Sequence, residues 1–174
     1  MGELEPKTKR VALATIFGAV IFISKTFLPS PIDKMFTLVH ALLLALGALL
    51  LGRMGATYIA AIGGALTALL RTSMAPFTLV FALSYGLLVD VFFFVFKINT
   101  AEGNVKTSRL VASMTISTAL LGVTSYYTTV FVVPLLQRNP MLELGILVIG
   151  TVNGIVAGYF ASVIWNRYLK NVKF

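Results

Sequence analysis

Several side chains that bind by charge or hydrogen bonding gather near one end of a series of apolar segments. They comprise two cations, an imidazole, two phenols and a carboxylate, namely Lys25, His40, Arg71, Tyr126, Tyr127 and Glu143. Asn153 follows Glu143 by ten residues, which in a helix places it roughly 15 Å deeper. Polar groups at membrane depth are costly unless they are paired or line a cavity. The spacing therefore predicts a binding site beneath one surface of a membrane bundle.

Each of these residues also has a purely structural interpretation. Lys25 and Arg71 lie near helix ends, from which long cationic side chains extend to the lipid headgroups. At least one of the two adjacent tyrosines is expected in an interfacial aromatic belt. Glu143 can complement the dipole of the helix in whose first turn it lies, and the histidine can be a hydrogen-bonded packing residue. The convergence of the whole set favours a site more than any single member does.

Asp90 lies in the opposite half of the fourth apolar segment, among Leu, Val and Phe residues. Its carboxylate is expected to be protonated, paired with a basic residue near the cytoplasmic interface, or placed at a subunit contact. A proton relay needs several acids in series, and no second carboxylate lies at a comparable depth. The sequence therefore disfavours a proton-coupled carrier.

The composition indicates that this chain is embedded in a lipid bilayer. Hydrophobic residues make up 58% and charged residues 11% of the sequence, whereas soluble domains are roughly 45–50% apolar. The net charge of +8 is interpreted as insertion bias and contact with membrane lipid, so no nucleic-acid partner is expected. With no Cys and a single His, disulfides, thiolate metal sites and a histidine-rich metal cluster are excluded. Hydrolase and kinase motifs are missing as well, so neither an enzyme nor a cofactor is expected.

Six apolar segments are long enough to be membrane spans, which need roughly 20 residues, although the second and third are short. They are residues 11–28, 36–51, 54–70, 76–96, 110–136 and 141–168. We expect an all-α membrane protein, a compact bundle of six transmembrane helices that forms a single domain over residues 1–174. An alternative merges the second and third segments into one kinked helix, which would break the alternation of charge described next.

The distribution of basic residues predicts the orientation. Ten of the 14 Lys and Arg residues fall before the first span, after the last, and in the second and fourth of the five connections. Cytoplasmic loops accumulate Lys and Arg because these charges cross the bilayer unfavourably during insertion. We therefore expect both the N and the C terminus in the cytoplasm of a multi-pass cell-membrane protein, with the polar cluster outside.

Small residues recur every four positions on two segments and form flat faces for helix contacts. The third segment carries Gly52, Ala56, Ala60, Gly64 and Ala68, and the sixth carries Gly150, Gly154, Gly158 and Ser162. Both stripes are interpreted as packing inside the bundle. A shorter version on the first segment, made by Ala14, Gly18 and Ala19, is a candidate surface for a partner subunit.

The whole chain resembles the S component, the substrate-binding membrane subunit of an energy-coupling factor vitamin transporter. The likeness rests on size, span count, a basic N-terminus before the first helix, and a Gly-rich last helix with a basic tail. Ala14 and Gly18 stand where the family has an Ala-xxx-Ala motif, with Gly as the one departure. The resemblance implies capture of a vitamin from outside, and docking through the first helix onto a transmembrane coupling subunit driven by two cytoplasmic ATPases.

The resemblance also suggests roles for the polar residues. Lys25 and Arg71 would suit a carboxylate or phosphate on the ligand. Four further side chains could stack against or hydrogen-bond a ring, namely Tyr85, Tyr126, Tyr127 and Asn153. Two rival hypotheses remain open. One is a non-transporting structural or assembly subunit of a larger membrane complex, and the other is a facilitator that works without an ATPase.

Overall fold

All regular secondary structure in the described part of the chain is helical. The computed structural model describes residues 4–27, 37–70, 75–100, 103–132 and 137–170, with side chains from Thr8 onward. Within these ranges the α-helices are α1 (Leu4–Phe27), α3 (Thr37–Leu51), α4 (Gly55–Leu70), α5 (Ala75–Val95), α6 (Thr107–Tyr127) and α7 (Pro140–Ile164). A π-helical turn extends α6 as η2 (Thr128–Val132), and another extends α7 as η3 (Trp165–Leu169). The expectation of an all-α protein with six helices is confirmed for this part of the chain.

Four of these helical stretches are long and apolar enough to cross a membrane. They are Thr8–Phe27, Ala75–Val95, Thr107–Val132 and Pro140–Leu169. The two other helices, α3 and α4, contain 15 and 16 residues. At 1.5 Å per residue they extend only about 22–24 Å, less than the hydrocarbon core of about 30 Å. Length and composition thus support a helical membrane protein with four clear spans.

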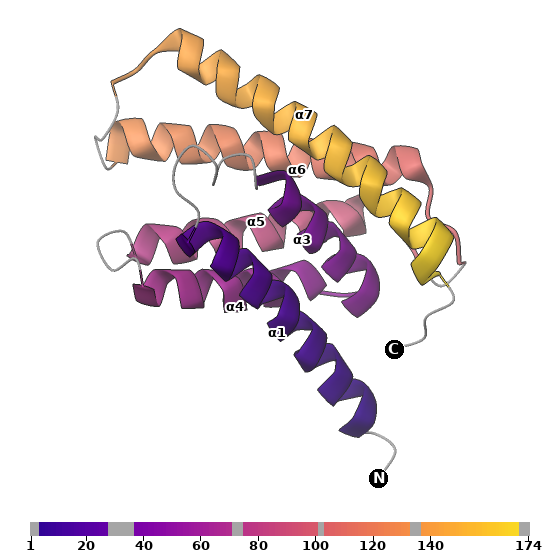
Figure 1. The fold of residues 1–174 in the computed structure, drawn as a ribbon. Helices are drawn as coiled ribbons and strands as arrows, with labels where there is room; N and C mark the ends of the chain where they lie inside the picture. The colour runs from indigo at the N-terminus through magenta and orange to yellow at the C-terminus, as the bar shows by residue number, and fades with distance from the viewer. Residues whose placement is uncertain (1–3, 28–36, 71–74, 101–102, 133–136, 171–174) are drawn as a thin grey trace.

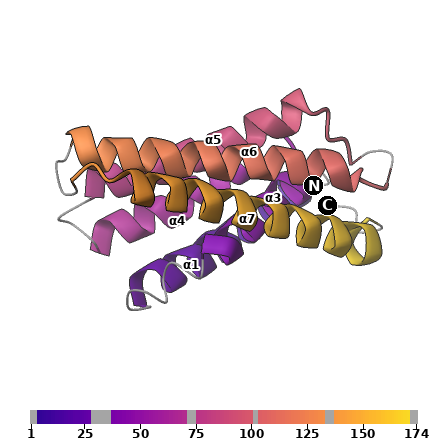
Figure 2. The ribbon, with the colours of Figure 1, turned by 90° about the horizontal axis from the view of Figure 1, so that it is seen from above.

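The helices run back and forth between two ends of the bundle (Figure 1). Both chain termini lie at one end, here called the terminal end, in two perpendicular views (Figures 1 and 2). At the opposite end, called the distal end, α1, α4 and α6 finish and α3, α5 and α7 begin. Because successive helices alternate in direction, the predicted polar residues of α1, α3, α6 and α7 lie toward the distal end.

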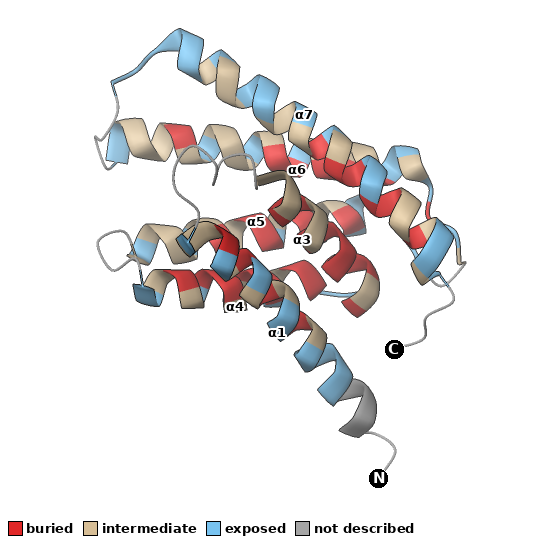
Figure 3. Ribbon diagram, viewed as in Figure 1, coloured by how far each residue is buried: buried red, intermediate tan, exposed pale blue. Residues whose placement is uncertain are grey.

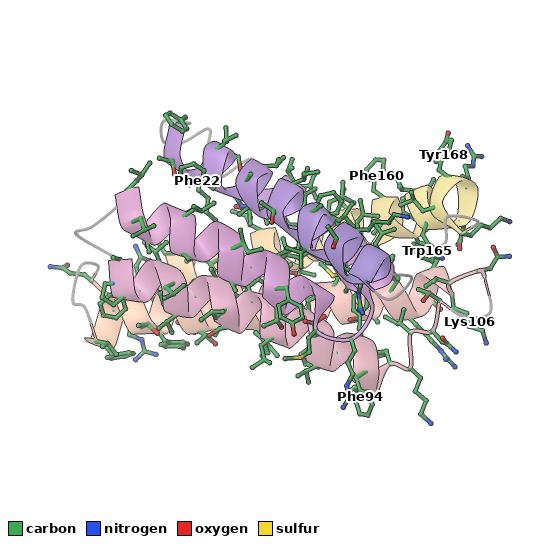
Figure 4. All side chains as sticks on the ribbon, turned by 90° about the horizontal axis from the view of Figure 1, so that it is seen from below. Phe22, Phe94, Lys106, Phe160, Trp165 and Tyr168 are labelled. Atoms are coloured by element: carbon green, nitrogen blue, oxygen red, sulfur yellow. The ribbon has the colours of Figure 1, made fainter. Side chains whose placement is uncertain are left out.

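The centre of the bundle is α3. It contacts each of the five other α-helices, and most of its residues are buried, including Leu44 and Leu49 (Figure 3). Its sequence is apolar on all sides apart from His40, as expected of a helix surrounded by protein. The outer faces of the surrounding helices are apolar as well. Phe94, for example, is 83% exposed and points away from the bundle (Figure 4), where lipid would cover it.

A tight turn separates α3 from α4. Gly52 and Met54 have φ angles of +68° and +66°, in the left-handed region that ends a helix. The two helices then pack closely against each other. The backbones approach so nearly that a Cβ added at Gly55 would overlap the Gly47 carbonyl oxygen. The alternative of one kinked helix across this region is therefore wrong.

The small-residue stripes on α4 and α7 pack inside the bundle, as predicted, except for Gly52, which is exposed in the turn before α4. A Cβ added at Gly86 of α5 would come within 2.7 Å of both the Ala56 carbonyl oxygen and the Ala60 Cβ on α4. On the other side of the bundle, a Cβ added at Gly154 of α7 would lie 2.5 Å from the Thr115 Cα on α6. Such close backbone approach increases van der Waals contact, which stabilises helix pairs in lipid.

Candidate functional site

At the distal end, a buried hydrogen bond joins α1 to the first turn of α3. Ser24 Oγ lies 2.6 Å from His40 Nε2 and also donates to the Ile21 carbonyl oxygen at 2.9 Å. The bond between Ser24 and His40 therefore ties α1 to α3. Lys25 lies close enough for its charge to act on His40. The structure thus brings together Lys25 and His40, two of the predicted site residues.

A second polar group at the distal end joins α6 to the start of α7. The buried Tyr126 hydroxyl donates to the Asn139 carbonyl oxygen at 3.0 Å and accepts from the Asn139 backbone N–H at 2.9 Å. Asn139 is also the N-cap of α7, since its side chain accepts from the Met141 N–H at 2.9 Å. Sequence reasoning missed Asn139, although Asn followed by Pro before an apolar run is a common helix-start signal.

Tyr127 makes a parallel connection one residue further on. Its hydroxyl donates to the Glu143 carboxylate. Its ring stacks on Phe131 with centroids 5.8 Å apart, and meets the edge of Tyr126 at 5.6 Å. Both tyrosines therefore connect the α6–α7 hairpin. Glu143 lies in the first turn of α7, as the capping interpretation expected.

Two predicted residues keep polar atoms without a protein partner. The Tyr85 hydroxyl of α5 is buried, with only 6% of the residue exposed, and it has no hydrogen-bond partner among the described residues. Tyr85 lies ten residues into α5, roughly 15 Å from its start, near the middle of the bundle. Asn153 of α7 is half-buried and makes no hydrogen bond with the residues that the structure describes. These two side chains are the ones in the predicted set that are free to bind a further group.

The predicted set is therefore divided. Arg71 lies outside the described residues, as do Pro29, Pro31 and Lys34 of the first distal loop. Lys25 and His40 lie on the α1–α3 side, while the tyrosines and Glu143 form a separate group on the α6–α7 side. The arrangement offers the Asn153 amide and the buried Tyr85 phenol to a ligand. Among the described residues there is no cluster that could hold a metal ion.

The candidate partner residues on α1 lie largely inside the bundle. Ala14 is 4% exposed, and a Cβ added at Gly18 would lie 2.8 Å from the Ile62 side chain of α4. Ala19 is half-buried. This stripe therefore contacts α4, and the exposed side of α1 is formed by other residues, among them Val11.

Asp90 has a role that none of the sequence interpretations named. Its carboxylate accepts from the Ala56 N–H at 3.2 Å, the Thr57 N–H at 2.8 Å and the Thr57 hydroxyl at 2.6 Å. These donors belong to the first turn of α4, whose free N–H groups attract an anion. Asp90 thus caps a neighbouring helix, and no basic residue is needed to balance it. Because Thr57 lies 33 residues away, sequence spacing carries no signal of this contact.

At the terminal end, the last helical turn holds the loop before α6. The Trp165 indole donates to the Gly103 carbonyl oxygen at 2.9 Å. Asn166 makes a two-way amide pair with the Val105 backbone, at 2.9 and 3.0 Å. Figure 4 shows Trp165 and Lys106 at the same end of the molecule. The loop and the chain end are therefore connected by three hydrogen bonds.

Two hollows open at the terminal end, and sequence reasoning predicted neither. One of about 570 Å³ lies between the α3–α4 turn and the end of α5, and both Arg53 and Asp90 border it. The other, of about 440 Å³, lies between α1 and α4, and Arg10, Arg53 and Tyr58 border it. Both are open to the surface, and Arg53 stands between them.

No family model, curated protein or solved structure matches this chain. Its function is therefore argued from its own residues.

Proposed function

We propose that this chain is the S component of an energy-coupling factor type transporter, and that it captures a vitamin or a related small molecule at the distal end. The observation that carries the proposal is the Tyr85 hydroxyl, which is buried in the bundle and has no hydrogen-bond partner in the part of the chain that the structure describes. A buried polar group without a partner is destabilising, and a ligand oxygen or nitrogen that reaches it would relieve that cost. Asn153 supplies a second free polar group, in the amide class that orients small ligands.

The distribution of charge and polarity supports the orientation. In this proposal all six helices span the membrane and both termini are cytoplasmic, because ten of the 14 basic residues fall on the terminal side. The short helices α3 and α4 cross where the surrounding helices and local bilayer thinning accommodate them. The distal end then faces outside, with Lys25 and His40 on one side of the bundle and Tyr127 and Glu143 on the other.

Delivery of the ligand inward would require a transmembrane coupling subunit and two cytoplasmic ATPases. No phosphate-cradling motif is present in the sequence, so a partner must supply the energy. Contact through α1 would use the side that α4 leaves uncovered. There, exposed Ala12 and Thr15 lie next to half-buried Ala19 and give a flat surface for a second helix.

The test begins with protein purified in detergent. Small molecules that co-purify are identified by mass spectrometry, and a panel of vitamins is titrated against the protein. Tyr85→Phe removes only the free hydroxyl, so ligand affinity is expected to fall about two- to tenfold, the value of one hydrogen bond. Tyr159→Phe is the matched control, because Tyr159 is 54% exposed on the outer face of α7. Unchanged affinity in Tyr85→Phe would remove the main support for this site.

A second candidate function is a structural or assembly subunit of a larger membrane complex, which binds no small molecule. The observation that favours it is that the tyrosines and Glu143 on the α6–α7 hairpin already bond within the protein. The same measurements separate the two functions. A structural subunit yields no co-purified ligand and no response to any member of the panel, and Tyr85→Phe then changes stability alone.

A further inference from the structure

The smaller hollow at the terminal end has the chemistry of an anion site with an apolar floor. Its polar border is formed by the two guanidinium groups of Arg10 and Arg53 and the phenol of Tyr58. The rest of its lining consists of Val11, Ala14, Leu51 and Ile62. A bare inorganic anion would gain nothing from such a floor, whereas an amphipathic anion would contact both parts.

Arg10 is held in place by the end of α3. Its Nη2 donates to the Leu51 carbonyl oxygen, in the last turn of that helix, where cations are favoured by the helix dipole. A guanidinium has five N–H groups in a planar fork, so this bond leaves other donors for a phosphate or carboxylate. Leu51 itself borders the hollow, and the bond therefore holds the Arg10 guanidinium beside it.

Arg53 is the free cation of the site. It lies in the turn between the left-handed residues Gly52 and Met54, and it makes no hydrogen bond or ion pair with any residue that the structure describes. The described residues that border this hollow include no Asp or Glu. Asp90 borders the neighbouring hollow, and its carboxylate caps α4. Among the described residues, the two guanidinium groups therefore have no carboxylate beside them in this hollow.

The surroundings of the hollow point to lipid as the source of the anion. Val11 is 64% exposed and Tyr58 is 61% exposed, so the hollow opens through a side of the bundle made of α1 and α4. Tyrosine is favoured at the headgroup level of a bilayer, and basic pockets between transmembrane helices bind anionic headgroups. We propose that this hollow binds the phosphate of an anionic phospholipid from the leaflet at the terminal end, with an acyl chain lying along the apolar floor. This proposal is independent of the transported ligand.

The test is native mass spectrometry of the full chain in detergent, with measured additions of phosphatidylglycerol or phosphatidylcholine. The wild-type protein is expected to retain phosphatidylglycerol in preference to phosphatidylcholine. Arg53→Gln removes one cation that has no bond to lose, so it is expected to weaken phosphatidylglycerol binding about fivefold. Arg109→Gln is the matched control, because Arg109 is exposed at the start of α6 and does not border the hollow.

The outcomes are distinct. A selective loss in Arg53→Gln, with the control at the wild-type affinity, supports the site. Equal losses in the two variants would show general surface attraction and would overturn it, as would equal retention of the two lipids. A competition arm adds inorganic phosphate at increasing concentration. Displacement of the lipid by inorganic phosphate at concentrations equal to those of the lipid would show a free-anion site, and would overturn the assignment to phospholipid.

Discussion

Replacing Asp90 with alanine is expected to destabilise the protein, because it removes the cap on α4. The carboxylate accepts three hydrogen bonds from Ala56 and Thr57, at 2.6–3.2 Å. Loss of an N-cap costs about 0.5–2 kcal/mol, and hydrogen bonds to charged groups contribute about 1.5–3 kcal/mol. Because Asp90 is only half-buried, we expect a decrease of about 2–3 kcal/mol in the free energy of unfolding.

Thermal unfolding followed by circular dichroism at fixed detergent concentration measures this effect. For a chain of this size, each kcal/mol changes Tm by about 2–4 °C, so Asp90→Ala is expected to lower Tm by about 4–12 °C. Thr57→Val removes the hydroxyl donor alone and is expected to cost about 1 kcal/mol. Each substitution removes the bond between the Thr57 hydroxyl and the carboxylate. The double variant is therefore expected to lose less stability than the sum of the losses in the two single variants.

The opposite result would be equally informative. If Asp90→Ala unfolds at the wild-type temperature, the carboxylate does not stabilise α4; if Thr57→Val and Asp90→Ala are fully additive, the bond between the Thr57 hydroxyl and the carboxylate contributes nothing. Asp90→Asn is the conservative control, since the amide oxygen still accepts a bond from the first turn of the helix. Its Tm is expected to fall between those of the wild type and Asp90→Ala.

Two further predictions concern the α6–α7 hairpin, with Tm as the measurement. Gly154→Ala is expected to cost about 1–3 kcal/mol, because a Cβ there would lie 2.5 Å from the Thr115 Cα. Gly145→Ala is its control, since a Cβ at Gly145 meets nothing within 4 Å, and equal effects of the two substitutions would refute the packing. Tyr126→Phe leaves the Asn139 backbone without its phenol partner and is expected to cost about 1–3 kcal/mol; a wild-type Tm would show that the bond contributes no stability.

The helices were readable from the sequence because lipid imposes a strong constraint on them. Every backbone polar group in hydrocarbon must bond within its own helix, so long apolar runs between Pro, Gly and charged residues mark the helices closely. Small residues at intervals of four, such as Gly154 and Gly158, likewise predicted the close packing of the helices that carry them. The start of α1 at Leu4 was not visible, because its first turns are polar and lie before the apolar run that begins at Val11.

The candidate site was predicted less completely, because its side chains choose partners by tertiary contact. Periodicity placed Tyr126 and Glu143 at the distal end, but it carried no information on the Asn139 backbone or on which tyrosine would reach which acceptor. The same holds for Asp90, whose partners lie on another helix. Spacing along one helix indicates depth and face, whereas hydrogen-bond pairing depends on how neighbouring helices are rotated and displaced.

The central position of α3 has a consequence for how the chain is made. This helix is synthesised before α4, α5 and α6, whereas α7, which packs against it, is synthesised after them. Domains form their structure as synthesis proceeds, but contacts distant in sequence must wait for the later segment. Until α7 arrives, one side of α3 has only lipid or the insertion machinery as a neighbour. The bundle can therefore be completed only after α7 has been synthesised, and a chain that stops before α7 would leave one side of α3 uncovered.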